Sequence, residues 1–415
     1  MKGLYAILTV AIAMTVLFSA VLVSAQTGRI YGRVYTQDDE AYEGIIRWDK
    51  NEVFWDDLLD ATKHVDARGE DRSRKVHHDI NILGIKINWT ETRDGDDEGE
   101  RRMGIRMGRL RSIKRRSRNS AVLILKDNSR LRVTSAVTDI GSSNRGIVVE
   151  DEEVGRITLD WSDFERVDFL PEPETIRENP PKDWRLYGTV TTWDEQEYSG
   201  FIVWDMDESL SSDILDGESR GEDHEIPFSK IRAIEHKSSS SAGVELTSGR
   251  KLRLRGTNDV NDGNRGIVIR VPHYGQITVE WDEFDRVEFR RPDPADLRGY
   301  DYYDAGEPLY GTVWDDQGER YRGWITWDDD ETHTYEFLDG ETDEVSVLLE
   351  FADIQSIERR SRRSATVKLN SGESFQLKGT CDVNDENRGI FIEDQEGDVI
   401  RLEWNDFDRV EFGRP

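Results

Sequence analysis

The sequence predicts an all-β protein built from three tandem repeats, and three observations support this fold class. A motif returns at 139–146, 259–266 and 382–389, as DIGSSNRG, DVNDGNRG and DVNDENRG. Apolar residues alternate with polar ones within each copy, as at Ile277 and Val279, which is the period of a half-buried strand. Gly, Asp, Asn and Ser separate these short runs, which is typical of antiparallel barrels and sandwiches.

The first 25 residues predict export. Lys2 precedes an apolar run at 4–22, and Val23-Ser-Ala before Gln26 supplies the small residues that a signal peptidase requires. We expect a signal peptide at 1–25, a periplasmic or secreted protein and no membrane span in the mature chain. An uncleaved N-terminal membrane anchor is the alternative, because the run is long enough to cross a bilayer. The single cysteine, Cys381, leaves no intrachain disulfide.

The spacing of the repeats sets the domain boundaries. Positions 187 and 310 begin copies two and three and lie 123 residues apart, whereas 31 and 187 lie 156 apart, so the first copy contains an insertion. We expect repeat 1 at 29–170 with the insertion at about 61–104, repeat 2 at 185–290 and repeat 3 at 308–413. The proline-containing segments 171–184 and 291–307 are predicted to be semi-rigid linkers.

Each repeat also looks doubled within itself. A strand, a short polar turn carrying Phe and a closing strand occur at 226–235 and again at 279–289. This ending resembles that of SH3-like small barrels, in which one helical turn joins the last two strands. The resemblance implies three pairs of SH3-like β-barrels, with one antiparallel β-sandwich per repeat as the alternative. A fold of this kind does not by itself assign a function.

Six tryptophans recur at two places in the repeat. Each shares a face with neighbouring Ile, Val or Leu side chains, so we expect them in the core rather than on a sugar-binding platform. They are Trp48, Trp204 and Trp327, and Trp161, Trp281 and Trp404.

The repeated loop is a candidate calcium site, because carboxylate and amide oxygens are the ligands of hard cations. No cofactor is expected to be required. The alternative is that Asp and Asn cap their own backbone in a tight turn, with Gly266 relieving a steric clash. The first copy, with Gly141-Ser-Ser, lacks most of the ligands. The candidate ligands are Asp259, Asn261, Asp262, Asn264, Asp382, Asn384, Asp385 and Asn387.

The net charge of −30 disfavours nucleic acid as the main partner. Two basic segments stand out against it and are candidates for binding polyanions. Pairing with the acidic surface of a neighbouring domain is the alternative. The candidate residues are Lys114, Arg115, Arg116, Arg118, Arg359, Arg360, Arg362 and Arg363.

Two further segments are candidates for binding. Tyr300, Tyr302 and Tyr303 lie in the second linker, where no core is expected to cover them, so they are candidates for carbohydrate binding. The insertion contains His64, His77 and His78 but lacks the ligand spacing of a zinc site.

The sequence contains no nucleophile-elbow motif, phosphate-binding glycine loop or zinc-helix signature. Three near-equal copies favour a binding or spacer module, since linked weak sites gain from effective concentration. We therefore expect a non-enzymatic, multivalent binding or scaffolding protein of the cell envelope or extracellular space, whose partner is a protein or polymer. The alternatives are a calcium-stabilised spacer, a polysaccharide-binding module and a hydrolase with its site in the repeat 1 insertion.

Overall fold

The computed structural model describes residues 26–65, 75–82, 85–92, 99–271 and 275–415. Antiparallel strands dominate it, and the helical segments are single short turns. This confirms the predicted all-β class. The expected signal peptide lies outside the described residues. Within them, no helix combines the length and the apolar composition that a membrane crossing requires.

Ten strands form each repeat. Those of repeat 1 are β1 (Tyr31–Thr36), β2 (Ala41–Arg47), β3 (Leu58–Val65), β6 (Gly99–Arg106), β7 (Leu110–Ser117), β8 (Ser120–Leu125), β9 (Arg130–Thr134), β10 (Ile147–Asp151), β11 (Gly155–Leu159) and β12 (Phe164–Phe169). Those of repeat 2 are β13 (Tyr187–Thr192), β14 (Glu197–Val203), β15 (Ile214–Ser219), β16 (Glu222–Pro227), β17 (Ile231–Ser238), β18 (Ser241–Leu246), β19 (Lys251–Arg255), β20 (Ile267–Val271), β21 (Gly275–Val279) and β22 (Phe284–Arg290).

Repeat 3 has the same succession of strands. They are β23 (Tyr310–Asp315), β24 (Arg320–Thr326), β25 (Phe337–Glu341), β26 (Ser346–Glu350), β27 (Ile354–Ser361), β28 (Ser364–Leu369), β29 (Ser374–Lys378), β30 (Ile390–Glu393), β31 (Val399–Leu402) and β32 (Phe407–Phe412). The helical turns are η1 (Met107–Arg109), α1 (Glu174–Glu178), η2 (Phe228–Lys230), η3 (Asn258–Val260), η4 (Pro294–Asp296), η5 (Tyr300–Tyr302), η6 (Phe351–Asp353) and η7 (Cys381–Val383).

The three repeats share one strand order. In repeat 1 it is β11-β10-β2-β1-β12-β7-β8-β9-β3-β6. The pairings of repeats 2 and 3 give the same order when their strands are counted from one to ten. The first and last strands of a repeat therefore lie side by side near the middle of its sheet, which closes each repeat on itself.

The two halves of a repeat exchange strands. In repeat 2 the first half comprises β13–β17 and the second β18–β22. Strand β13 pairs with β22 and β14 pairs with β20, so the first hairpin of one half joins the last three strands of the other. Reciprocally, β18 pairs with β17 and β19 with β15. The doubling expected from the sequence is present, but two independent barrels are not: the halves interlock in one ten-stranded sheet.

The insertion of repeat 1 lies between β3 and β6, which pair with each other along eight residues. It carries a separate hairpin of β4 (Lys75–Ile82) and β5 (Ile85–Thr92). The side chains of this hairpin lie outside the described residues, and so do the three histidines noted in the insertion.

The core is built on the repeated tryptophans, as the alternation predicted. All six are at most 2 % exposed. Within each repeat two of them meet edge to face with a phenylalanine, as Trp204 does with Trp281 and Phe284 at ring-centroid distances of 6.3 and 5.4 Å. One set of buried residues serves repeat 1, and a continuous set serves repeats 2 and 3.

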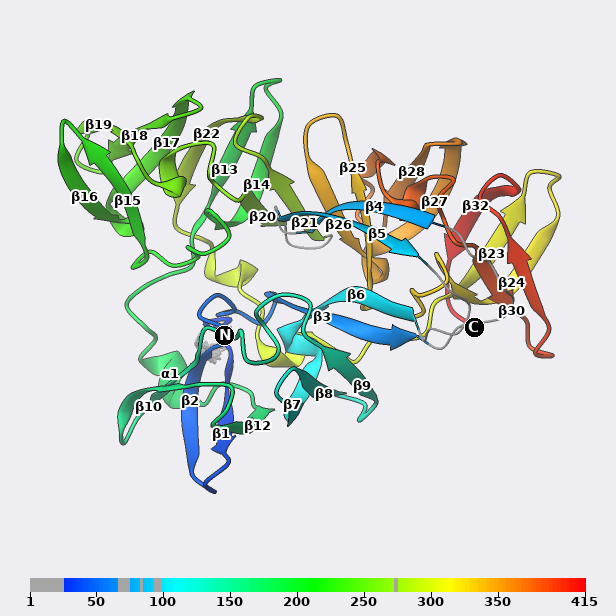
Figure 1. The fold of residues 1–415 in the computed structure, drawn as a ribbon, viewed down its shortest axis with the longest axis horizontal. Helices are drawn as coiled ribbons and strands as arrows, with labels where there is room; N and C mark the ends of the chain where they lie inside the picture. Colours follow the sequence, from blue (N-terminus) through cyan, green and yellow to red (C-terminus); the bar gives the residue numbers. More distant parts are fainter. Residues whose placement is uncertain (1–25, 66–74, 83–84, 93–98, 272–274) are drawn as a thin grey trace, which may run out of the picture.

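The three repeats lie against one another (Figure 1). Strand pairing and buried ion pairs join them. Strand β21 of repeat 2 pairs with β26 of repeat 3, which continues the sheet from one repeat into the next. Glu350 of repeat 3 accepts hydrogen bonds from Arg106 and Arg109 of repeat 1, at 2.8 and 2.7 Å. Arg185 of repeat 2 donates to Asp56 of repeat 1 at 2.6 Å. The repeats thus form one body rather than separate units on linkers.

Candidate functional site

In each repeat, two connections carry the chain from one half of the sheet to the other, and they meet at one place. The first connection follows the second strand of the repeat, and the other carries the repeated loop that ends in Asn-Arg-Gly. Three carboxylates and an arginine gather there, and we name this group the crossover cluster. Its members are Asp49, Glu52, Asp139 and Arg145 in repeat 1, Asp205, Glu208, Asp259 and Arg265 in repeat 2, and Asp328, Glu331, Asp382 and Arg388 in repeat 3.

A tight turn places the first two carboxylates of the cluster. In repeat 2, Trp204 donates its backbone N–H to Glu208 O at 2.8 Å, and Asp205 and Met206 between them have φ of 48° and 61°. Repeats 1 and 3 have the same pair of left-handed residues. This backbone conformation suits Asp and Asn better than most residues, because their short side chains tolerate it. The turn directs both carboxylates into the interior.

The repeated loop supplies the third carboxylate, and its polar groups hold the crossing in place. Asp259 Oδ2 accepts from the backbone N–H of Asp216 at 2.7 Å, and its carbonyl accepts from Trp204 Nε1 at 2.9 Å. Asn264 Oδ1 accepts from the N–H of Gly266 at 3.0 Å, and Gly266 has a φ of 131°. The same bonds recur in repeats 1 and 3. These contacts support the interpretation of the loop as a structural turn.

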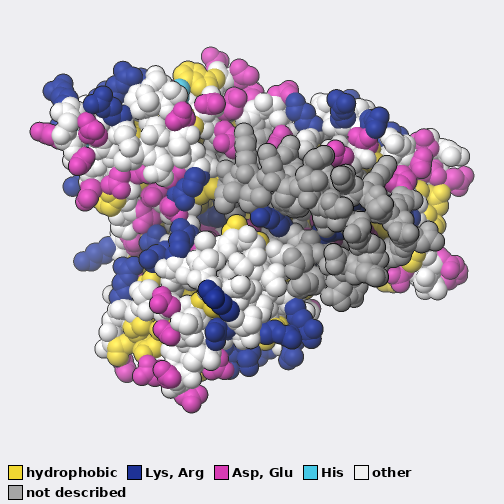
Figure 2. All heavy atoms as spheres, in the orientation of Figure 1, with side chains coloured by type: hydrophobic (Ala, Val, Ile, Leu, Met, Phe, Trp, Pro, Cys, Tyr) yellow, Lys and Arg dark blue, Asp and Glu magenta, His cyan; other side chains and the backbone are white. Residues whose placement is uncertain are grey.

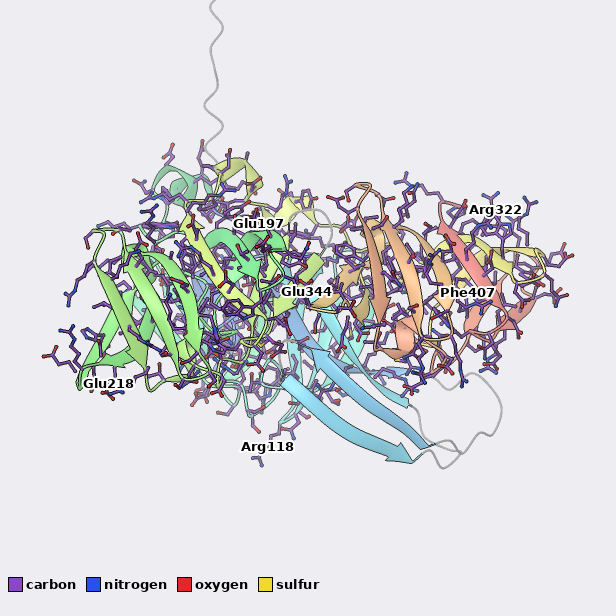
Figure 3. All side chains as sticks on the ribbon, turned by 90° about the horizontal axis from the view of Figure 1, so that it is seen from above. Arg118, Glu197, Glu218, Arg322, Glu344 and Phe407 are labelled. Carbon is purple, nitrogen blue, oxygen red and sulfur yellow. The ribbon has the colours of Figure 1, made fainter. Side chains whose placement is uncertain are left out.

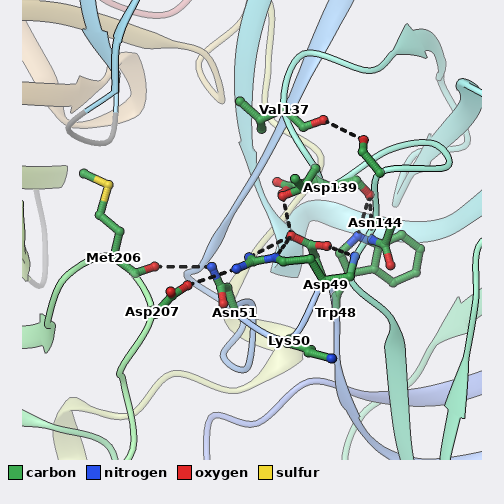
Figure 4. Close-up of polar contacts among 12 residues, drawn as sticks. Trp48, Asp49, Lys50, Asn51, Val137, Asp139, Asn144, Met206 and Asp207 are labelled. Carbon is green, nitrogen blue, oxygen red and sulfur yellow. Dashed lines mark hydrogen bonds and ion pairs between the residues drawn. The ribbon is translucent and has the colours of Figure 1, made fainter. Parts of the chain in front are cut away.

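The arginine of the loop neutralises one carboxylate of the cluster. Arg265 pairs with Asp205, whose side chain is 1 % exposed, at 2.8 Å. In repeat 1, Arg145 pairs with Asp49 at 2.8 Å and reaches Asp207 of repeat 2 at 3.0 Å (Figure 4). The clusters of repeats 1 and 2 are therefore joined by a shared cation.

A lysine of repeat 1 pairs with carboxylates beside the cluster of repeat 3. Lys63 Nζ lies 3.5 Å from Asp330 Oδ2 and also pairs with Glu336. Both carboxylates belong to the turn of repeat 3 that leads into the crossing. Repeat 1 thus contacts the crossover clusters of both other repeats.

The remaining carboxyl groups of the clusters are strongly perturbed by burial. Burial and the neighbouring Asp259 carboxylate raise the pKa of Glu208 to about 9, and burial raises the pKa of Asp259 itself to about 6. In repeat 3, burial holds the pKa values of Glu331 and Asp382 well above their usual range. A buried carboxylate of this kind is stabilised when its charge is neutralised, either by a bound proton or by a bound cation.

Of the four aspartates among the eight loop residues that the sequence singled out as calcium ligands, Asp259 and Asp382 lie in groups of closely spaced carboxylates. Asn261 caps the exposed N–H of Gly263 at 2.7 Å, and Asp385 pairs with Arg362 at the surface. Asp262 lies in no such group of the described residues. The side-chain oxygens of Asn264, Asn387 and Asn384 accept from the backbone N–H groups of Gly266, Gly389 and Glu386.

Sequence reasoning missed the glutamate of the cluster. Its signal is a Trp-Asp-x-x-Glu motif that recurs at 48–52, 204–208 and 327–331. The repeated Trp of this motif is a predicted core residue, and the motif as a whole was not among the predicted sites.

A cavity of about 240 Å³ lies between repeats 1 and 2. Glu52 and Asp139 of the repeat 1 cluster line it, together with Arg265 and Arg270 of repeat 2. Burial raises the pKa of Asp60 in its wall to about 7.

A second repeated feature is a basic three-stranded meander. We name β7–β9 (110–134), β17–β19 (231–255) and β27–β29 (354–378) the basic meanders. They contain 8, 6 and 6 Lys and Arg residues against 1, 2 and 2 Asp and Glu residues, which gives +7, +4 and +4. Since the whole chain carries −30, everything outside the meanders carries −45. Figure 2 shows Lys and Arg side chains gathered over β7, β8 and β9.

The polyanion-binding candidates all lie in the first and third basic meanders. Lys114 and Arg116 are exposed and have no ion-pair partner among the described residues. Arg118, in the turn between β7 and β8, lies at the edge of the molecule (Figure 3) and donates to Ser142 Oγ at 3.1 Å. Arg115 is partly buried.

The third basic meander is more extensively paired. Arg359 donates to the carbonyl of Phe407, and Arg362 pairs with Asp385. Arg360 lies 3.9 Å from Glu358, while Arg363 is exposed without an ion-pair partner in the described part of the chain. These contacts stay within repeat 3 and do not reach a neighbouring repeat.

The three linker tyrosines do not form an exposed platform, which corrects the expectation that no core would cover them. Tyr303 is 8 % exposed and packs onto Gly108 of repeat 1. Tyr300 stacks 4.7 Å from Trp55 and donates to Leu110 O at 3.0 Å. Only Tyr302, 57 % exposed, faces solvent. Tyr300 and Tyr303 therefore hold the second linker against repeat 1.

In comparisons with known proteins, no protein-family model, curated protein or solved structure matches this chain.

Proposed function

We propose that this chain is an exported, non-enzymatic scaffold that binds acidic polymers through its three basic meanders. The observation that carries the proposal is the segregation of charge: +15 lies on the three meanders and −45 on the rest. A polymer of negative charge would be attracted to the meanders and repelled elsewhere, so the acidic remainder would orient it. The signal peptide that the sequence predicts at 1–25 favours a partner outside the cytoplasm, such as an acidic polysaccharide.

The strand register of repeat 1 places the basic residues on one surface. Lys114 of β7 lies opposite Val122 of β8, which lies opposite Arg132 of β9. Arg130 lies two residues before Arg132 on β9, so the two side chains share one face of the strand, and both are exposed. Neighbouring strands stand about 4.8 Å apart, so these cations form a row that several charges of one polymer chain can contact together.

Three meanders in one body would act together. The inter-repeat ion pairs and the β21–β26 pairing hold them in fixed relation, so a long polymer that binds one meander meets the others without a further loss of freedom. This supports weak individual sites with a strong combined affinity. Because exposed charges are screened by salt, the binding is expected to weaken steeply as ionic strength rises.

A charge-neutralising variant tests the proposal. The variant Lys114→Gln, Arg116→Gln, Arg130→Gln and Arg132→Gln removes four exposed cations from the first basic meander. We expect it to bind immobilised alginate and dextran sulfate about tenfold more weakly than the natural chain at low salt, since fewer counterions are released on binding. Biolayer interferometry measures both affinities.

The matched control removes four exposed cations outside the meanders, as Arg156→Gln, Arg220→Gln, Arg320→Gln and Arg414→Gln. It changes net charge equally and should bind within about twofold of the natural chain. Equal weakening by both variants, or no binding by the natural chain at low salt, would show that the meanders are not the binding surface. Preference for duplex DNA over both polysaccharides would also contradict the proposal.

A further inference from the structure

The carboxylates of the crossover clusters converge on a point that a cation can occupy. In repeat 1 one oxygen each from Asp49, Glu52 and Asp139 lies within 4.8 Å of the other two, and the corresponding residues of repeat 2 do the same. Calcium binds oxygen at about 2.4 Å, so two ligands on opposite sides of it are separated by about this span. The spacing therefore matches carboxylates that share one ion.

In repeat 3 the carboxylates fall into two groups that share Asp328. Oxygens of Asp328, Asp330 and Glu331 lie within 4.8 Å of one another, and Asp328 also forms such a group with Cys381 and Asp382. Only repeat 3 has a sulfur at this position, whereas all three repeats have the carboxylates. The shared donor set is oxygen alone, which suits a hard cation.

One glutamate oxygen of each cluster lacks a hydrogen-bond partner among the described residues. Glu331 is 9 % exposed, and its Oε2 is buried without a hydrogen-bond partner among the described residues. Oε2 of Glu52 and of Glu208 are unpartnered in the same way. An orphaned buried carboxylate oxygen is costly, and native structures rarely keep one without a reason. Here the same atom is left unpartnered three times.

The charges of the clusters are also unbalanced. In repeat 3, Asp328, Asp330, Glu331 and Asp382 stand against two cations, Arg388 and Lys63. Lys63 also pairs with Glu336, so five carboxylates face these two cations, and the fully ionised group has an excess of three negative charges, most of which one divalent cation offsets.

Repeats 1 and 2 share the same imbalance. Arg145 and Arg265 are the cations that pair with their cluster carboxylates and with Asp207. These two face seven carboxylates, namely Asp49, Glu52, Asp139, Asp205, Asp207, Glu208 and Asp259. One divalent cation in each cluster would offset most of this excess.

We propose that the crossover cluster of each repeat is a calcium site, in which Glu52, Glu208 and Glu331 supply the oxygen that has no protein partner. The ion would join the two connections that exchange strands and so lock the two halves of a repeat together. This inference is independent of polymer binding at the basic meanders. It concerns buried groups in the two crossing connections of each repeat, which lie outside the meanders.

Terbium luminescence tests the sites directly, because Tb³⁺ replaces Ca²⁺ and emits when a nearby indole transfers energy to it. Trp48, Trp204 and Trp327 each donate Nε1–H to the carbonyl of the cluster aspartate, at 2.9, 2.9 and 3.1 Å. We expect sensitised emission that saturates at three ions per chain and is displaced by calcium. The variant Glu331→Gln should lose one of the three.

The control variant Glu396→Gln alters an exposed carboxylate group, Asp394, Glu396 and Asp398, and should keep all three ions. Thermal melting of the natural chain provides a second readout that needs no variant to fold: calcium should raise the melting temperature relative to a chelator. Absence of sensitised emission would overturn the proposal. So would a Glu331→Gln variant that melts higher than the natural chain to the same extent with and without calcium, since a shared proton would then hold the cluster.

Discussion

At the scale of single residues, Glu208 sets an expected pH response. Burial and Asp259 raise its pKa to about 9, so the folded state holds a proton that the unfolded state releases near the ordinary pKa of Glu. This contribution to stability is complete below about pH 4.5 and is lost as the pH rises through about 9. In the presence of a chelator, Glu208→Gln should therefore raise the melting temperature more at pH 9 than at pH 5.

Glu222→Gln is the matched control for this experiment, because Glu222 is exposed in the adjoining β15–β16 hairpin. Its effect on the melting temperature should not vary between pH 5 and pH 9. A Glu208→Gln effect that is equally independent of pH would show that the carboxyl group is not held protonated in the folded chain.

The residues of the repeated loop show what the sequence can reveal and what it cannot. A turn held by Asp259, Asn264 and Gly266 could be predicted, because each residue type has a local backbone role. The partner of Arg265 could not, since Asp205 lies 60 residues away along the chain. Tyr303 was expected at the surface for the same reason: nothing local reveals that Gly108 of another repeat leaves room for its ring.

At the scale of elements, the sequence predicts the strands but not which of them pair. Alternation and turn residues mark each hairpin, and the hairpins β13–β14 and β20–β21 form as those signals indicate. The exchange of hairpins between halves leaves these local signals unchanged. The alternation and turn residues are the same whether a half pairs its own strands or exchanges a hairpin with the other half. Only the long-range strand pairings distinguish the two arrangements.

A glycine in the second strand of each repeat allows that strand to approach its exchanged partner, the eighth strand, closely. A Cβ at Gly323 would lie 2.0 Å from the carbonyl oxygen of Glu393, the last residue of β30, and Gly44 and Gly200 are placed alike. Since backbone cannot yield as a flexible side chain can, Gly323→Ala should destabilise repeat 3 by about 2 kcal/mol or more. Chemical denaturation followed by tryptophan fluorescence measures the loss.

Gly413→Ala is the control, because no heavy atom lies within 4 Å of its added Cβ. It should leave the denaturation midpoint unchanged. If Gly323→Ala were equally neutral, strands β24 and β30 would not approach as closely as the exchanged pairing requires.

At the scale of the whole molecule, Glu350 joins repeat 1 to repeat 3. It accepts from Arg106 and Arg109, and all three side chains are nearly buried. Glu350→Ala leaves Arg106 buried without its carboxylate and Arg109 with Asp304 alone. Breaking a buried pair costs about 3–5 kcal/mol. We expect repeat 1 to separate from repeat 3, with a larger radius of gyration in solution scattering and faster proteolysis in the linker 291–307.

Glu341→Ala, which changes a glutamate at the end of β25 in the same repeat, serves as the comparison and should keep the compact dimensions. A Glu350→Ala chain with unchanged scattering and unchanged proteolysis would mean that β21–β26 pairing and the other ion pairs suffice to hold the three repeats together.

The division of charge between the meanders and the remainder is visible in the sequence only after the strands are known. Composition gives the net charge, and two arginine-rich segments stand out locally. The basic positions of repeat 2, such as Arg232, Lys251 and Arg253, are scattered along the chain and are gathered only when β17, β18 and β19 pair. The basic meander of repeat 2 therefore could not be identified from spacing alone.

Arginine footprinting with phenylglyoxal, in the presence and absence of dextran sulfate, tests most directly whether the basic meanders are the binding surface. Modification at each arginine is read by mass spectrometry. We predict that the polymer protects the exposed arginines of the meanders, including Arg116, Arg132 and Arg363, and leaves Arg156 and Arg320 as reactive as before. Uniform protection of all exposed arginines, or protection only outside 110–134, 231–255 and 354–378, would contradict the account.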